Sequence, residues 1–155
     1  TLEQLAAQIA SPDVKATFDK LVLPRKLPGP DGSTVDARPV YEAAMRDARP
    51  ALQKLYADTF AQHRLDGIVF PTVPAVAMPA GPESSSVENF VRYIRNTDPG
   101  SNAGVPGITL PVALGETTRL PVGLEIDGPA GSDRRLVAIG MALEQVFGRL
   151  APPGR

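Results

Sequence analysis

Two neighbouring stretches of the chain alternate apolar and polar residues with the period of a β-strand. Apolar side chains occupy every second position of residues 108–114 and again of residues 120–126. They are Ile108, Leu110, Val112 and Leu114 in the first stretch, and Leu120, Val122, Leu124 and Ile126 in the second. A period of two places these side chains on one face of each strand, and that face is expected to be buried. Residues 115–119 form a link short enough for a turn, so the pattern predicts an antiparallel β-hairpin.

Elsewhere the apolar positions follow the 3.6-residue period of a helix. Residues 1–23 are predicted to form one or two short helices, with Ser11 as a cap and Pro12 in the first turn of the second. Asp36 is a suitable cap for a long helix that runs to about Arg64. Pro50 interrupts this helix, but the apolar stripe stays in phase across it. We therefore expect a kinked helix, with two helices meeting at Pro50 as the alternative.

Two more helices and one further strand complete the pattern. Residues 87–95 predict a short helix capped by Ser85 or Ser86, and Ser132 is the expected cap of a final helix. The core-facing positions of that final helix are Leu136, Ile139, Leu143, Val146, Phe147 and Leu150. The continuous apolar run over 68–70 predicts a strand buried on both faces. Such a strand needs neighbours on both sides, and the hairpin supplies at most one, so the α/β pattern indicates part of a larger sheet.

Two segments rich in proline and glycine separate these elements. Residues 24–32 are expected to be an unpaired connector. Residues 96–107 contain Pro99, Gly100, Gly104, Pro106 and Gly107, and we expect a shaped loop there and no helix. A long ordered loop before a buried hairpin is a plausible pocket wall. The candidate substrate-binding residues in this loop are Asp98, Ser101 and Asn102.

Composition narrows the function classes. The chain of 155 residues is 43% hydrophobic and 21% charged with a net charge of −1, which argues against a nucleic-acid platform. It has no apolar run of membrane-spanning length and no cysteine. His63 is the only histidine, so neither a metal site nor a Ser–His–Asp triad is expected. We expect an intracellular, cytoplasmic protein without a cofactor.

Residues for nucleophilic catalysis are present, but not in a suitable arrangement. None of the lysines lies in an apolar setting that would make it a base for a serine. The run Ser84–Ser86 is expected to be a flexible cap, and Ser101 to be a loop residue or a substrate contact. Glu125 and Asp127 share the polar face of a strand, where we expect solvated side chains. The sequence therefore offers no catalytic residue.

Four ordered motifs resemble the C-terminal part of the amidase signature family. They are Asp66-Gly-Ile-Val-Phe-Pro-Thr-Val-Pro74, Asn102-Ala-Gly-Val-Pro-Gly-Ile-Thr-Leu-Pro111, Leu120-Pro-Val-Gly-Leu-Glu-Ile-Asp-Gly128 and Asp133-Arg-Arg-Leu-Val-Ala-Ile-Gly-Met-Ala-Leu-Glu-Gln145. The resemblance covers about residues 36–150. Within the family, residues 96–102 and 125–133 look most like the arylacetamide members.

The resemblance implies an α/β fold in which this chain is the C-terminal portion of a mixed sheet flanked by helices. It implies residues 1–155 to be one portion of a larger amidase domain, with no internal boundary. It further implies an amide hydrolase with a Ser–cis-Ser–Lys triad, whose members no residue of this chain matches. The expected partners are a small amide substrate and the N-terminal remainder of the enzyme, with homo-oligomers as a further outcome. The alternative is a non-catalytic binding or structural chain that keeps part of the fold.

Overall fold

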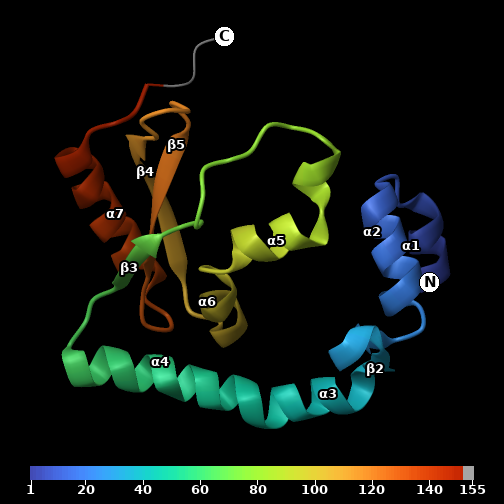
Figure 1. The fold of residues 1–155 in the computed structure, drawn as a ribbon. Helices are drawn as coiled ribbons and strands as arrows, with labels where there is room; N and C mark the ends of the chain where they lie inside the picture. The colour runs from blue at the N-terminus through green and yellow to red at the C-terminus, as the bar shows by residue number, and fades with distance from the viewer. Residues whose placement is uncertain (152–155) are drawn as a thin grey trace. The chain divides into compact units, whose positions relative to one another are not determined.

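The structure, a computed structural model, describes residues 1–151. It contains two compact units, Thr1–Ala48 and Arg49–Arg155, which are described separately. The tail expected over 151–155 lies, from residue 152 on, outside the described residues. The helices and strands of both units are shown in Figure 1.

The first unit is mainly helical and includes a small sheet. Its helical segments are α1 (Leu2–Gln8), α2 (Pro12–Thr17), a π turn η1 (Phe18–Val22), a 3-10 turn η2 (Pro30–Gly32), α3 (Ala37–Ala43) and a π turn η3 (Ala44–Ala48). The short helices predicted before residue 23 are confirmed. Strand β1 (Lys26–Pro28) pairs antiparallel with β2 (Thr34–Asp36), so the prediction of an unpaired connector over 24–32 is wrong. The pairing forms because Asp31 and Gly32 adopt positive φ values of 64° and 73°, which reverse the chain between the strands.

The helix predicted to begin after Asp36 is confirmed. The Asp36 carboxylate accepts a hydrogen bond of 3.0 Å from the backbone N–H of Arg38. The helical run continues without a break through η3 into α4 (Arg49–His63). Its irregularity next to Pro50 is the π turn of η3. A wider turn gives room for the proline ring, which in a regular α-helix would meet the carbonyl four residues earlier.

The second unit is built around a three-stranded antiparallel sheet of order β3-β5-β4. After α4, its elements are β3 (Ile68–Pro71), a 3-10 turn η4 (Pro82–Ser85), α5 (Val87–Ile94), α6 (Asp98–Ala103), β4 (Gly107–Leu114), β5 (Pro121–Asp127) and α7 (Asp133–Phe147). The predicted hairpin is confirmed as β4 and β5, with Ile108 opposite Ile126 and Leu110 opposite Leu124. The register shifts between Pro111 and Ala113, where the proline cannot donate to the ladder.

One face of the sheet carries the core. Leu110 of β4, Ile126 of β5 and Leu136 of α7 are 7%, 2% and 2% exposed, and Ile108, Val112, Ile139 and Leu143 pack against them. Helix α7 covers this face (Figure 1). The predicted core positions of α7 are therefore confirmed as far as Leu143. Val146 and Phe147 are 76% and 47% exposed, so their predicted burial is wrong in this chain.

Strand β3 is an edge strand. Among the described residues it pairs only with β5, from Ile68 opposite Asp127 to Pro71 opposite Leu124. The prediction that this run is buried on both faces is wrong here, because Val69 is 59% exposed. The hairpin supplies its one neighbour, as the sequence indicated.

Candidate functional site

A short helix occupies the segment that the sequence predicted to be a shaped loop. Helix α6 spans Asp98–Ala103, so the expectation of no helix over 96–107 is wrong. Pro99 is tolerated because it lies in the first turn, where no N–H is needed within the helix. Gly104 ends the helix with a φ of 74°, and its N–H donates to the Gly100 carbonyl over 2.9 Å. Proline and glycine thus mark the two ends of one helical segment.

The three candidate substrate-binding residues lie together on α6. Asp98, Ser101 and Asn102 are spaced three and four residues apart, which places them on one side of the helix, and all three are exposed. The Asn102 side-chain amide donates to the Asp98 carbonyl over 3.0 Å. The Asn102 carbonyl accepts a 3.1 Å hydrogen bond from Nε of Arg49 in α4. The exposed side of α6 is therefore a small polar surface, which we call the 98–102 face.

The other side of α6 lies against the end of β5. Gly100 and Ala103 are the buried residues of the helix. Gly100 is so close to the Asp127 carboxylate that a β-carbon at position 100 would overlap its Oδ2 atom. The helix can approach the sheet this closely because position 100 carries no side chain.

A row of polar side chains crosses this face of the sheet. Thr72, just after β3, lies 3.4 Å from Thr109 of β4, hydroxyl oxygen to hydroxyl oxygen. The Thr109 hydroxyl in turn donates to a carboxylate oxygen of Glu125 in β5. Glu125 and Asp127 are 8% and 4% exposed, so the prediction that they are solvated is wrong. Both lie on the face opposite the apolar core, where α6 reaches the end of the sheet.

The two buried carboxylates are close neighbours. A β-carbon built on Gly107 would lie 2.7 Å from Oε1 of Glu125 and 2.8 Å from Oδ1 of Asp127, so these oxygens are at most 5.5 Å apart. Burial, and then the negative charge of Glu125, raise the pKa of Asp127 from 3.8 to about 6. Oδ2 of Asp127 is enclosed and has no hydrogen-bond partner among the described residues. This side chain can therefore exchange a proton near neutral pH.

The sequence analysis noticed the carboxylates but not their burial. The signal that could have revealed it is the set of small residues facing them across the strands. Gly107 pairs with Asp127 and Thr109 pairs with Glu125. Small residues opposite two acidic ones leave room for carboxylates between layers. That reading requires the strand register, and it requires α6 to be recognised as a helix.

A cleft lies beside this carboxylate pair, between α4 and the ends of α6 and β5. It has a volume of about 590 Å³. Its lining is mostly apolar: Gln53, Tyr56, Ala57, Phe60, Ala61, Leu65, Ala103, Gly104, Val105, Pro129 and Ala130. Burial and the charge of Asp127 raise the pKa of Tyr56, which places its hydroxyl in the field of that carboxylate. A partly polar cleft of this size can hold a small organic molecule.

The serines and lysines have local roles. Ser84 donates to the Gly81 carbonyl over 2.6 Å, and Ser86 caps α5 by accepting from the Asn89 N–H, as predicted. Lys15 and Lys54 form ion pairs with acidic residues one helical turn away. In the part of the chain that the structure describes, no hydrogen bond joins a lysine to a serine. None of the helices up to residue 151 is long and apolar enough to span a membrane, and that same stretch contains no cluster of three metal-binding side chains.

Comparison with known proteins gives consistent relatives. Mandelamide hydrolase of Pseudomonas putida is 44% identical over 155 residues, which covers 100% of this chain and 31% of that protein. Indoleacetamide hydrolase of Rhizobium radiobacter is 53% identical over 114 residues, covering 70% of this chain and 24% of that protein. The chain thus spans less than a third of the length of these relatives.

Solved structures show the same fold. A glutamyl-tRNA(Gln) amidotransferase from Thermotoga maritima matches with a TM-score of 0.56 at 26% identity, over 72% of this chain and 24% of that one. A crystal structure of an amidase matches with a TM-score of 0.54 at 28% identity, over 86% of this chain and 32% of that one. The α/β fold expected from the sequence is confirmed. The sequence model of the Amidase family matches residues 15–137, and this chain therefore belongs to the Amidase family.

Proposed function

We propose that this chain is the C-terminal portion of an amide hydrolase that acts on a small, aryl-substituted primary amide. The observation that supports this is the 44% identity with mandelamide hydrolase over all 155 residues, joined by the 53% identity with indoleacetamide hydrolase. Mandelamide and indoleacetamide are both acetamides that carry an aromatic ring near the amide. The products would be the corresponding carboxylic acid and ammonia.

The chemistry we propose uses a Ser–cis-Ser–Lys triad that lies outside these residues. The lysine and the bridging serine remove the proton from the nucleophilic serine, which forms an ester with the acyl group as the C–N bond breaks. The nitrogen takes up a proton and leaves as ammonia. Water then hydrolyses the ester and regenerates the serine.

Within that enzyme we assign this chain the role of a pocket wall. Asp98, Ser101 and Asn102 offer acceptors and donors on the 98–102 face, and a primary amide has both an N–H₂ donor and a carbonyl acceptor. The apolar cleft lined by Tyr56 and Phe60 lies beside the same helix. The cytoplasmic location, the homo-oligomer and the membership of residues 1–155 in one larger domain stay predictions.

The test is ammonia release by the full-length protein from mandelamide, indoleacetamide and phenylacetamide. We expect turnover of at least one of them. Alanine substitutions at Asp98, Ser101 and Asn102 should raise KM, while Glu116→Ala in the exposed hairpin turn serves as the matched control. A full-length protein that hydrolyses none of these amides would instead support the non-catalytic alternative.

Residues 1–155 alone provide the complementary measurement. We expect the isolated chain to show no amidase activity, because no serine–lysine pair suited to catalysis is present in it. Turnover of phenylacetamide by the purified chain, abolished by substituting one of its own serines, would contradict the proposed place of the triad.

A further inference from the structure

The segment from Gly100 to Gly107 wraps around the side chain of Asp127. We call this segment the 100–107 arch. On one side Gly100 of α6 contacts Oδ2, and on the other a β-carbon on Gly107 would lie 2.8 Å from Oδ1. The N–H of Gly128 donates to the Pro106 carbonyl over 2.9 Å, which ties the arch to the residue after Asp127. The carboxylate is thus enclosed by the same segment that carries the 98–102 face.

We propose that Asp127 is a positioning residue for substrate binding: its enclosed carboxylate determines how α6 lies on the sheet, and thereby the position of the 98–102 face. This inference rests on the proposed function, because it takes that face as part of the substrate pocket. It assigns no contact between Asp127 and the substrate. Oδ2 is covered by α6, so its influence passes through the helix.

The contact has little room for adjustment. Helix α6 has only six residues, so it has few internal hydrogen bonds to hold it in place. Its attachments to the rest of the unit are the hydrogen bond from Arg49 to Asn102 and a 3.0 Å bond from the Gln53 amide to the Ala103 carbonyl. Both come from α4 and act on the C-terminal half of the helix. Gly100 on Asp127 is therefore the contact that fixes α6 against the sheet itself.

Charge makes this contact sensitive to protonation. Glu125 on the same strand is at most 5.5 Å from Asp127, oxygen to oxygen, and Tyr56 approaches from α4. Next to β3, Asp66 is held in a 2.5 Å ion pair with Arg135. The facing positions of α6 and β4 are glycine and threonine, which do not titrate. No basic group among the described residues pairs with Asp127, so its ionisation places two negative charges under the arch. Their repulsion, and the need of an ionised Oδ2 for solvent, favour a loosened α6.

Hydrogen exchange in the full-length protein tests the mechanical step without reference to activity. The amides to follow are those of Gly104 and Val105, both of which donate to the Gly100 carbonyl. After correction for intrinsic rates, we expect their protection to fall on the order of 10-fold from pH 5 to pH 8. A pKa displaced from 3.8 to about 6 limits the effect to about 100-fold. In Asp127→Asn the protection should not depend on pH, whereas Glu116→Gln should behave as wild type.

Kinetics with an aryl amide test the consequence for binding. In wild type we expect KM to rise several-fold between pH 5 and 8 through this step, and Asp127→Asn should remove that part of the pH dependence. Because Asp127 does not touch the reacting atoms, kcat should keep its pH profile. A mainly structural role would lower the amount of active enzyme without changing the pH dependence of KM.

A pair of variants covers the case in which Asp127→Asn does not fold. Gly100→Ala should raise KM, because its methyl group displaces the carboxylate, and adding Asp127→Ala should restore KM by making room. The proposal is overturned if Gly100→Ala has no effect, if Asp127→Ala gives no rescue, or if protection at Gly104 and Val105 is equally pH-dependent in wild type and Asp127→Asn. If no amide is hydrolysed at all, the proposed function fails, while the exchange measurement still decides the role of Asp127.

Discussion

Thr109 on β4 lies directly opposite Glu125 on β5 and donates its hydroxyl hydrogen bond to the Glu125 carboxylate. Glu125 is only 8% exposed, so the loss of this donor leaves a buried charged group with poorer solvation. We expect Thr109→Val, which keeps the shape of the side chain, to lower the stability of the full-length protein by about 1–3 kcal/mol. The measurement is the melting temperature at pH 7.5 and a fixed scan rate.

Thr109→Ser is the matched control, because it keeps the hydroxyl and removes only a methyl group. It should stay much closer to wild type than Thr109→Val. Equal losses in the two variants would show that packing of the methyl group, and not the hydrogen bond to Glu125, accounts for the effect.

Gly104 is the residue at which the conformation of the arch requires glycine. Its φ is 74°, in the left-handed region that a β-branched residue avoids. We expect Gly104→Val to destabilise the full-length protein by about 1–3 kcal/mol. Gly104→Asn should cost clearly less, since asparagine tolerates this conformation. Gly81, which is extended with nothing near its β-position, provides a control: Gly81→Ala should leave the melting temperature almost unchanged.

The elements with strong periodicity were predictable from the sequence. Leu110, Ile126 and Leu136 were expected in the core from periods of two and 3.6, and they form its centre. The caps at Asp36 and Ser86 were predicted from residue type, because a short side-chain acceptor satisfies the free N–H groups at a helix start. These features depend on neighbours close in sequence, or on a single apolar face.

The features that were missed depend on contacts distant in sequence. Pro99 and Gly100 give α6 a poor helix propensity, and its position on the sheet depends on a contact between Gly100 and Asp127. Once α6 was taken for a loop, nothing was expected to cover Glu125, and period two alone does not tell a solvated face from one buried by another layer. The error about the carboxylates therefore followed from the error about the helix.

Asp127 should make the stability of the protein depend on pH in a defined window. Its pKa is raised from 3.8 to about 6 in the folded state, so between these values the folded protein keeps a proton that the unfolded chain has lost. The contribution is fully present below pH 3.8 and is lost as the pH rises through about 6. At pH 7.5, Asp127→Asn should thus be more stable than wild type, by up to about 3 kcal/mol.

The comparison is made by melting both proteins at several pH values from 4 to 8, because other groups also titrate over this range. The difference between wild type and Asp127→Asn should grow from pH 4 to about 6 and then level off. A difference that does not vary with pH would mean that Asp127 has an ordinary pKa in the full-length protein. A basic side chain supplied by the longer polypeptide is one way in which that result would arise.

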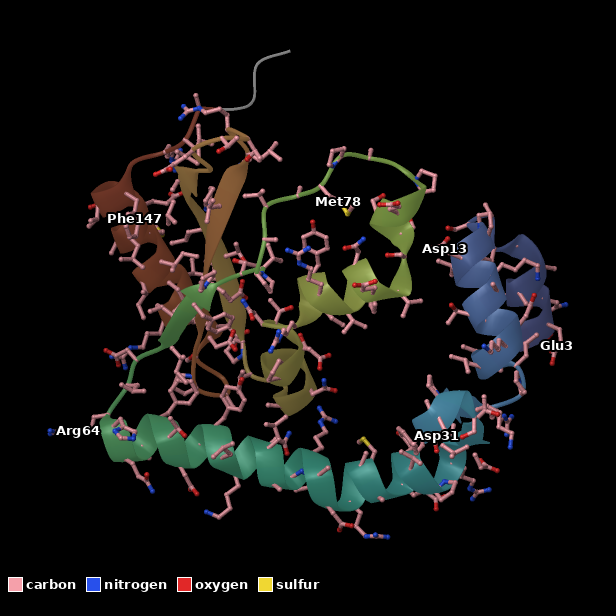
Figure 2. All side chains as sticks on the ribbon, viewed as in Figure 1. Glu3, Asp13, Asp31, Arg64, Met78 and Phe147 are labelled. Carbon is pink, nitrogen blue, oxygen red and sulfur yellow. The ribbon has the colours of Figure 1, made fainter. Side chains whose placement is uncertain are left out.

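Residues 1–155 on their own should self-associate or fold poorly. Strand β3 has one neighbour among the described residues, and its Val69 is 59% exposed. Further apolar side chains are exposed on α5 and α7, including Phe90 and Phe147, the latter labelled in Figure 2. An open strand edge beside apolar surface can satisfy its N–H and C=O groups by pairing with a second copy of the chain.

Light scattering combined with amide hydrogen exchange on the isolated chain can test this expectation. We expect a mass above that of the monomer, or weak protection of the strand amides together with stronger protection in α4 and α7, whose backbone bonds are internal. Val69→Lys, which places a charge on the exposed side of the edge strand, should reduce association, while the same change at exposed Glu116 in the hairpin turn should not. A compact monomer at high concentration, with the amides of 68–70 among the best protected, would contradict the prediction. It would show that the three strands need no further neighbours, and that this chain folds as a complete domain.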